Sequence, residues 1–447
     1  MPGCSSNVSG ALTELAAISS MGAYLVIQPE ITFWRSMYRR HTNFARAEQC
    51  VGFCSSVGFD KKLRATIPRS GDLIWNTYFE PRLTALRLPA QQQATDYVYW
   101  VNAVGQVMID EASLTIGGAQ VDKFDSNYLF IWEELSRQAG KNQGEAIGKF
   151  DNIEDQRDFA FYDQTLYTKL PFFFSGPSTT SISSSSCNAL ALIALQYHDV
   201  CIELCIRKRE NLIVAHDDAN PPVVIPLSQV TGGDMEDANL LIDYVFLDTC
   251  ERSQMASQAH EFLIGQVQMS CCESVVAGST RKSIPLHFNH PTTELFVVYS
   301  EDYKRQAPVN RFTDYSIDAE VPFPWAAAGP LPKVDPLDTL ELKFNGHDRI
   351  SAREAKYFRL IQPYQFHSSL PSGYIYNYCF SIAPEDDVQP RGAADLSRID
   401  NVVLCLEFAK KANGSSLLIN DGQVCTYARS MNVAKMAGGM FATKYSN

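Results

Sequence analysis

The sequence predicts an all-β protein that contains two consecutive copies of one strand-rich domain of the sandwich or jelly-roll type. Short apolar runs, several with a two-residue period, alternate with turn residues along most of the chain. In addition, three motifs of the first half recur in the same order in the second half. The pairs are Leu114-x-Ile116-x-Gly118 with Leu342-x-Phe344-x-Gly346, Phe172-Phe173-Phe174-Ser175 with Tyr378-Cys379-Phe380-Ser381, and Val200-x-Ile202-x-Leu204-x-Ile206 with Val402-x-Leu404-x-Leu406-x-Phe408.

Length and charge narrow the range of functions. The chain has 447 residues, of which 45% are hydrophobic, and this is enough for two to four domains with large cores. The net charge of −12 disfavours binding to phosphate backbones, which needs concentrated Lys and Arg. Residues 1–23 lack the basic start of a secretory signal, and no stretch reaches the ~20 apolar residues of a membrane helix. We therefore expect a soluble protein.

The twelve cysteines do not follow the spacing of a zinc site. Cys50 and Cys54 are four residues apart, as are Cys201 and Cys205, but no Cys-x-x-Cys pair occurs. The sequence therefore predicts buried free thiols, which suits synthesis in a reducing cytosol.

The chain begins with a predicted arm, residues 1–24, in which Leu12, Leu15 and Ala16 recur at helical spacing. The following stretch, residues 24–45, is rich in Thr, Val, Ile and aromatic residues and is predicted to be extended. Pro29 places it at the start of a strand or on a sheet edge.

The first domain is predicted over residues 25–249. A strand over Leu73–Phe79 should stop before Pro81. A helix over 125–137, capped by Asp125 or Ser126, should bury a stripe that includes Trp132. The other expected elements are a surface loop over 138–159, a buried strand over Lys169–Phe174, a serine-rich loop over Thr179–Ser186, a loop over 207–237 and a closing strand over Leu240–Leu247.

A linker helix is predicted over residues 250–263, because Met255, Ala259 and Phe262 follow a helical spacing. The second domain then spans 264–447 and includes a Pro-, Ala- and Gly-rich loop over 321–333.

We assign no catalytic, cofactor-binding or metal-binding residues. His287 and His290 are three apart, so in a strand they face opposite sides and cannot share a metal. The acidic pairs Asp243 with Asp248 and Asp386 with Asp387 are interpreted as strand-end and loop charges. No nucleophile elbow, phosphate loop or dinucleotide fingerprint is visible. The sequons at Asn7 and Asn413 are interpreted as chance matches.

Several motifs together carry a resemblance to a known family. They are Tyr24–Ala45, Asp243–Thr249 followed by Glu251-Arg252, Phe288–Thr292, Phe344–Arg349, Ser397–Asn401, and Met436–Met440 with the tail Tyr445–Asn447. In this order the chain resembles the major capsid proteins of large nucleocytoplasmic DNA viruses, most closely those of the algal-virus branch. The resemblance covers nearly the whole chain.

The resemblance implies two fused eight-stranded jelly rolls per chain and a homotrimer that forms a pseudo-hexagonal capsomer of an icosahedral virion shell. It further implies neighbouring capsomers as partners, minor capsid proteins at the arm and capsomer base, synthesis in the host cytoplasm, and proximity to an inner viral membrane without insertion. Neither an enzymatic activity nor direct nucleic-acid binding is expected.

Three alternatives remain open at the level of the sequence. A jelly-roll glycan-binding or attachment protein could use Pro324 and Trp325 with Asp314 and Tyr315. The chain could also be a minor capsid paralogue. A cupin-like metalloenzyme would need two histidines two residues apart on one strand, and no His-x-His occurs.

Overall fold

The computed structural model describes residues 8–30, 32–34, 40–89, 97–138, 140–175, 189–217, 224–318, 333–386, 389–411 and 414–445. The contacts divide the chain into two units, Met1–Asn43 and Phe44–Asn447. Among the described residues, no helix combines the length and the apolar character needed to cross a membrane.

The first unit contains two short helices among its described residues. Helix α1 spans Val8–Ala16 and helix α2 spans Ser20–Val26. The side chain of Ser19 caps α2 by accepting a hydrogen bond from the backbone N–H of Gly22 at 3.0 Å. The extended structure predicted over 24–45 is therefore wrong at its start, and the first strand begins only at Phe44. Residues 35–39 of this stretch lie outside the described residues.

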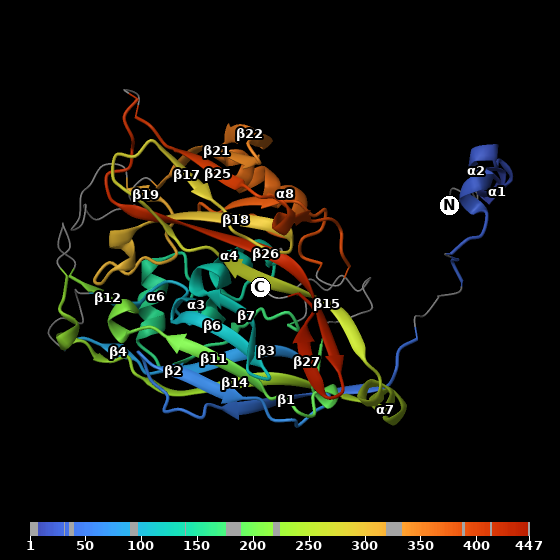
Figure 1. Cartoon of the computed structure of the whole chain (residues 1–447), viewed down its shortest axis with the longest axis horizontal. Coiled ribbons are helices and arrows are strands. Elements are labelled where there is room, and N and C mark those ends of the chain that lie inside the picture. Colours follow the sequence, from blue (N-terminus) through green and yellow to red (C-terminus); the bar gives the residue numbers. More distant parts are fainter. Residues whose placement is uncertain are drawn as a thin grey trace, which may run out of the picture. The chain divides into compact units, whose positions relative to one another are not determined.

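The second unit begins with a jelly roll of two facing antiparallel sheets (Figure 1). Along its main path, the first sheet has the order β1-β14-β3-β10, and the second sheet has the order β2-β11-β6-β7. The strands are β1 Phe44–Gly52, β14 Met235–Leu247, β3 Leu73–Leu83, β10 Leu190–Ala191, β2 Lys62–Thr66, β11 Val200–Ile206, β6 Ile109–Ile116 and β7 Ala119–Asp125.

A second jelly roll follows with the same order of strands. Its sheets run β15-β26-β18-β23 and β17-β25-β21-β22, so each strand has a counterpart in the first copy. The strands are β15 His260–Met269, β26 Gly422–Ala437, β18 Pro291–Glu301, β23 Tyr376–Cys379, β17 Arg281–Pro285, β25 Val402–Phe408, β21 Leu337–Phe344 and β22 His347–Glu354. The predicted double jelly roll is confirmed, and two of the repeated motifs lie on the matched pairs β6 with β21 and β11 with β25.

Short elements connect and flank these strands. The helices are α3 Val104–Val107, α4 Ser126–Ser136, α5 Gly144–Ile147, α6 Ile153–Ala160, η1 Leu192–Ala194, η2 Arg209–Asn211, η3 Leu227–Gln229, α7 Thr249–Ser257, η4 Asp302–Arg305, η5 Tyr357–Ile361, α8 Gln362–Phe366 and η6 Leu396–Arg398. The strands are β4 Leu86–Arg87, β5 Tyr97–Trp100, β8 Gln164–Thr165, β9 Thr168–Lys169, β12 Ile213–His216, β13 Thr231–Gly232, β16 Glu273–Val275, β19 Ile317–Asp318, β20 Lys333–Val334, β24 Ala394–Asp395 and β27 Met440–Thr443.

Two strand predictions need correction. Strand β3 does not stop before Pro81 but continues to Leu83. Beside Pro81 lies the short segment that connects β8 and β9. It forms a hydrogen bond only with the proline carbonyl, which accepts from the N–H of Leu166 at 3.0 Å. The strand predicted over Lys169–Phe174 ends at Lys169, and the three phenylalanines that follow form a buried turn.

The loops and the linker also differ from prediction. The loop over 138–159 contains α5 and most of α6, and the loop over 207–237 contains β12 and β13. Helix α7 ends at Ser257, and the predicted linker end already belongs to β15. The loops at 179–186 and 321–333 lie outside the described residues, apart from Lys333, which begins β20.

The cysteines are not all reduced and buried. Cys272 and Cys425 form a disulfide, which the sequence pattern could not indicate because 153 residues separate them. Of the free cysteines that the structure describes, Cys201, Cys379 and Cys405 are buried, whereas Cys50, Cys54, Cys250 and Cys271 are exposed.

Candidate functional site

The two jelly rolls share a buried interface along β18. Antiparallel sheets commonly leave one face to solvent, but every residue of β18 after Pro291 is buried. Leu295 and Val297 face the core of the second jelly roll, whereas Phe296 and Val298 belong to the cluster that includes the first core. The outer face of this sheet is therefore covered, and the apolar cluster of the first jelly roll extends onto the second.

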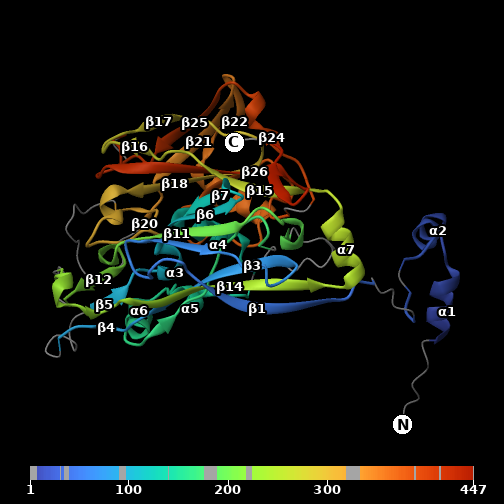
Figure 2. The ribbon, with the colours of Figure 1, turned by 60° about the horizontal axis from the view of Figure 1, so that its bottom comes forward.

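Helix α4 lies in this interface and follows directly from β7 (Figure 2). Asp125 caps it by accepting from the N–H of Tyr128 at 2.9 Å, as predicted. The ring of Tyr128 lies 6.2 Å from the rings of both Phe296 and Tyr427 in the second jelly roll. Trp132 is only half-buried, and the Arg429 guanidinium lies over its ring, 3.9 Å from the ring centre.

Four polar side chains are sealed between the jelly rolls. The hydroxyl of Tyr427 donates to Asp125 Oδ2 at 2.8 Å and accepts from Asn127 Nδ2 at 3.1 Å. The Tyr315 hydroxyl donates to Asn127 Oδ1 at 3.3 Å. Burial raises the pKa of Asp125 above its ordinary value, even though hydrogen bonds from Tyr128 and Tyr427 oppose this. Because each buried group has a partner, the network specifies one relative placement of the two copies.

A charged connection extends the interface at the far end of α4. Glu134 forms an ion pair with Lys149, which precedes α6. The other carboxylate oxygen of Glu134 accepts from the N–H and the hydroxyl of Ser372, both at 2.7 Å. One buried carboxylate thus joins the 138–159 segment to the second jelly roll.

The junction between the two copies is also held by specific contacts. Asp72 accepts from the N–H of Leu247 at 2.9 Å and pairs with Arg252 on α7 at 3.0 Å. Asp243 on β14 pairs with Arg46 at 3.1 Å, and Asp248 caps α7. Asp243 and Asp248 thus have separate structural roles, an ion pair and a helix cap, as their interpretation as strand-end and loop charges predicted.

A second buried polar cluster lies at the edge of the second jelly roll. Glu294 on β18 is directly opposite Cys379 on β23, and Asn377 occupies the same face two residues earlier. His367, which directly follows α8, places Nε2 at 2.9 Å from Glu294 Oε2 and at 3.7 Å from Cys379 Sγ. The carboxylate of Glu385 lies 3.2 Å from the other ring nitrogen.

The electrostatics of this cluster are strongly coupled. Burial lowers the pKa of His367, but the charge of Glu294 together with hydrogen bonds to Cys379, Glu294 and Glu385 outweighs it and holds the pKa well above its ordinary value. Burial raises the pKa of the Cys379 thiol to about 11. Among the described residues, Glu294, His367 and Cys379 are the only set of three whose side chains could together hold a metal ion. These residues lie 12 to 85 positions apart, so closely spaced motifs in the sequence do not reveal them.

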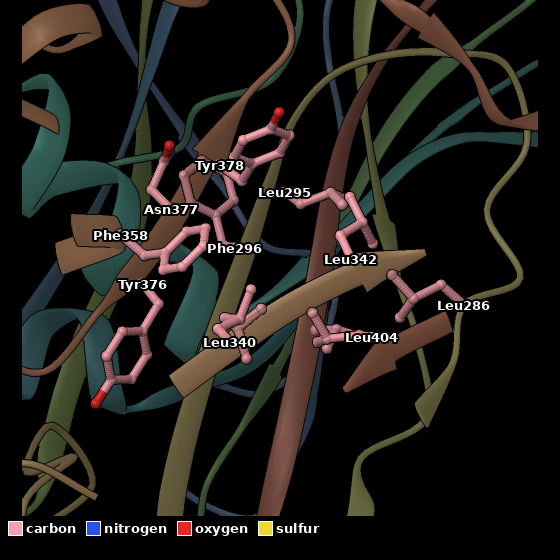
Figure 3. A pocket seen from close by; sticks show the side chains of 12 residues that line it. Leu286, Leu295, Phe296, Leu340, Leu342, Phe358, Tyr376, Asn377, Tyr378 and Leu404 are labelled. Carbon is pink, nitrogen blue, oxygen red and sulfur yellow. The ribbon is translucent and has the colours of Figure 1, made fainter. Parts of the chain in front are cut away.

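The core of the second jelly roll contains a small apolar cavity (Figure 3). Its volume of about 10 Å³ is at the lower limit for one water molecule. Leu340, Leu342 and Leu404 line it together with Phe358 and Tyr376. This cavity offers neither the space nor the convergent polar groups of a substrate site.

The candidate sugar site is not assembled as expected. Tyr315 is 2% exposed and forms part of the interface network, so it cannot stack on an external sugar. Asp314 lies 3.4 Å from Lys304. Pro324 and Trp325 lie outside the described residues, as do both sequon asparagines.

Comparisons with known proteins cover almost the whole chain. Residues 32–248 match the family described as major capsid protein N-terminus, and residues 251–442 match the large eukaryotic DNA virus major capsid protein. The major capsid protein of Phaeocystis pouchetii virus is 30% identical, with 98% of this chain and all of that protein covered. The major capsid protein of Paramecium bursaria Chlorella virus 1 is 28% identical over the same shares of the two chains.

Solved structures agree with this relationship. A chain of the PBCV-1 virus capsid matches with a TM-score of 0.72 and 27% identity, over 93% of this chain and all of that one. The Faustovirus major capsid protein shares the fold with a TM-score of 0.72 at 10% identity, over 96% of this chain and 98% of the other. Together with the matched strand orders of the two jelly rolls, these similarities show that the chain belongs to the major capsid protein family of large nucleocytoplasmic DNA viruses.

Proposed function

We propose that three copies of this chain close into a pseudo-hexagonal capsomer and that such capsomers tile an icosahedral shell. The observation that carries this proposal is the identical strand order of the two jelly rolls, joined through a buried interface. Three chains then present six similar sandwich units around a threefold axis. Each contact between chains is heterologous, and the ring closes after three copies.

Exposed apolar side chains supply material for the contacts between chains. Around α8, large hydrophobic residues remain exposed on the second jelly roll: Ile361 (44%), Tyr364 (76%), Leu370 (46%) and Ile382 (77%). Obligate interfaces typically bury more than about 2,000 Å² and are rich in such residues. The segment 138–159 and the loops at 207–237 and 321–333 are further candidates for these contacts.

The other proposed roles are those that membership in this capsid protein family suggests. The arm, residues 1–24, contacts minor capsid proteins at the capsomer base, and the chain has no enzymatic role. It does not bind nucleic acid directly, which the net charge of −12 supports. Synthesis takes place in the host cytoplasm, and the shell stands next to an inner viral membrane without inserting into it.

Electron microscopy of the purified full-length protein tests the proposal. We expect class averages with threefold symmetry and six similar lobes, two from each chain. Particles with only two lobes at micromolar concentration would contradict the capsomer.

A further inference from the structure

We propose that Glu294, His367 and Cys379 bind a structural divalent cation in the second jelly roll, and that zinc is the ion they fit best. The three side chains offer one carboxylate oxygen, one imidazole nitrogen and one thiolate sulfur, the donor types that zinc takes in proteins. The Glu294 and His367 side chains are both 0% exposed and Cys379 is 8% exposed, so the site is closed to bulk water. A closed site of this kind is structural rather than catalytic.

The separations between the donor atoms fit one ion. Tetrahedral zinc, with bonds of about 2.0–2.1 Å to nitrogen and oxygen and about 2.3 Å to sulfur, separates its ligand atoms by roughly 3.3–3.6 Å. Here Nε2 and Oε2 are 2.9 Å apart, Nε2 and Sγ 3.7 Å, and Sγ and Oε2 4.0 Å. Movements of a few tenths of an ångström would therefore complete the coordination.

Asn377 points to a cation at the same place. Its Nδ2 lies 2.9 Å from His367 Nε2 and 3.1 Å from Glu294 Oε2, while Nε2 also lies 2.9 Å from Oε2. If Nε2 carries a proton, two N–H donors face each other. If it does not, two lone pairs face each other. Turning the amide over instead brings Oδ1 against Oε2.

With Glu294 ionised, each of these arrangements thus leaves one repulsive contact. A cation among Nε2, Oε2 and Sγ removes the conflict. With the amide turned over, Asn377 then supplies its oxygen as a fourth ligand.

The surrounding residues have the features of a metal site's outer shell. Metal-binding histidines usually donate their second N–H to a carboxylate, which fixes the ring. Glu385 occupies this position, 3.2 Å from His367 Nδ1, and is held by the N–H of Ser368 at 2.8 Å and its hydroxyl at 2.6 Å. The alternative, a Cys–His nucleophile, is disfavoured because burial raises the pKa of Cys379 to about 11, whereas a metal would displace that proton.

The ion would connect the long segment between β22 and β23 to the edge strand of the sheet. Strand β23 ends the main path of its sheet, and His367 comes from the segment that returns from β22 through η5 and α8. A hydrogen bond also joins this segment to β23: the N–H of Cys379 donates to Gln362 Oε1 at 3.1 Å. The exposed side chains of Ile361 and Tyr364 belong to the same segment.

Elemental analysis of the purified full-length protein after dialysis against metal-free buffer tests the inference. We expect about one zinc ion per chain. The variants Cys379→Ser and His367→Gln should lose most of it, whereas Cys405→Ser, which alters another buried free thiol of the same jelly roll, should retain it. Wild-type protein without bound metal, or a folded Cys379→Ser variant that keeps its zinc, would overturn the proposal.

If both variants fail to fold, X-ray absorption at the zinc edge of the wild-type protein decides the question. One sulfur and three lighter ligands per zinc would support the site. Coordination by two or more sulfurs would place the metal elsewhere and overturn it. Neither result depends on the oligomeric state, so this inference can fail while the proposed capsomer stands.

Discussion

The hydroxyl of Tyr427, on the central strand β26 of the second jelly roll, donates a 2.8 Å hydrogen bond to Asp125, the residue that caps helix α4 of the first. This contact joins residues 302 positions apart. It shows what holds the two copies in place. The Asp125 carboxylate caps a helix of the first copy and accepts a hydrogen bond from the second.

Replacing Tyr427 with Phe tests this contact. The change leaves the buried Asp125 carboxylate without its hydroxyl donor, and we expect a loss of about 1–3 kcal/mol in the free energy of unfolding. Chemical denaturation measures it. Tyr162→Phe, at a side chain that is 71% exposed, is the control and should change stability by less than about 0.5 kcal/mol. Equal effects of the two variants would show that the network contributes nothing.

Trp132→Ala removes the ring that supports Arg429. Full burial would predict a loss of ~3–5 kcal/mol. Because Trp132 is only half-buried, we expect about 2–3 kcal/mol, part of it from the lost cation–π contact. Thermal and denaturant unfolding measure the loss. The control Trp34→Ala, at a ring that is 88% exposed, should be close to neutral. A loss below about 1 kcal/mol at Trp132 would mean that α4 is not held by its stripe.

Lys169 should make stability depend on pH in the alkaline range. Burial lowers its pKa to about 8, against about 10.4 in an unfolded chain. Between these values the unfolded lysine keeps a proton that the folded one has released, so stability rises with pH, by at most about 1.4 kcal/mol per unit.

The variant Lys169→Met lacks this titration. The difference in unfolding free energy between variant and wild type should therefore be constant below pH 8 and should shift in favour of the wild type from there to about pH 10.4. A difference that does not change over this range would contradict the buried lysine.

Deleting residues 1–23 should separate folding from assembly. The deletion removes α1 and part of α2, which belong to a unit distinct from the double jelly roll, and Leu15 and Met21 are 72% and 75% exposed. We expect an unchanged melting temperature and impaired particle formation, seen by calorimetry and electron microscopy. Normal particles from the shortened chain would show that the arm is dispensable.

Local signals predicted the local structure well. The cap at Asp125 and most of the α4 stripe depend on residues a few positions apart and are confirmed, whereas Trp132 of the stripe is only half-buried. The repeated motifs also identified the duplication, because strands in equivalent positions keep the same alternation of apolar residues.

The contacts between the two jelly rolls and those of the Glu294 cluster join distant residues and give no local signal in the sequence. The second buried face of β18 exists only because the first jelly roll covers it. Glu294 and Cys379 meet only through the pairing of β18 with β23, and His367 reaches them from the end of α8. Likewise, Pro81 does not end β3, because the adjacent segment at Leu166 forms a hydrogen bond only with the Pro81 carbonyl and needs no N–H from the proline.

The mass of the purified protein in solution tests the proposed capsomer most directly. Light scattering coupled to size-exclusion chromatography should give about 150 kDa, three times the 49.9 kDa chain, and the value should persist on dilution to micromolar concentration. A folded particle of one chain mass, 49.9 kDa, under the same conditions would contradict it.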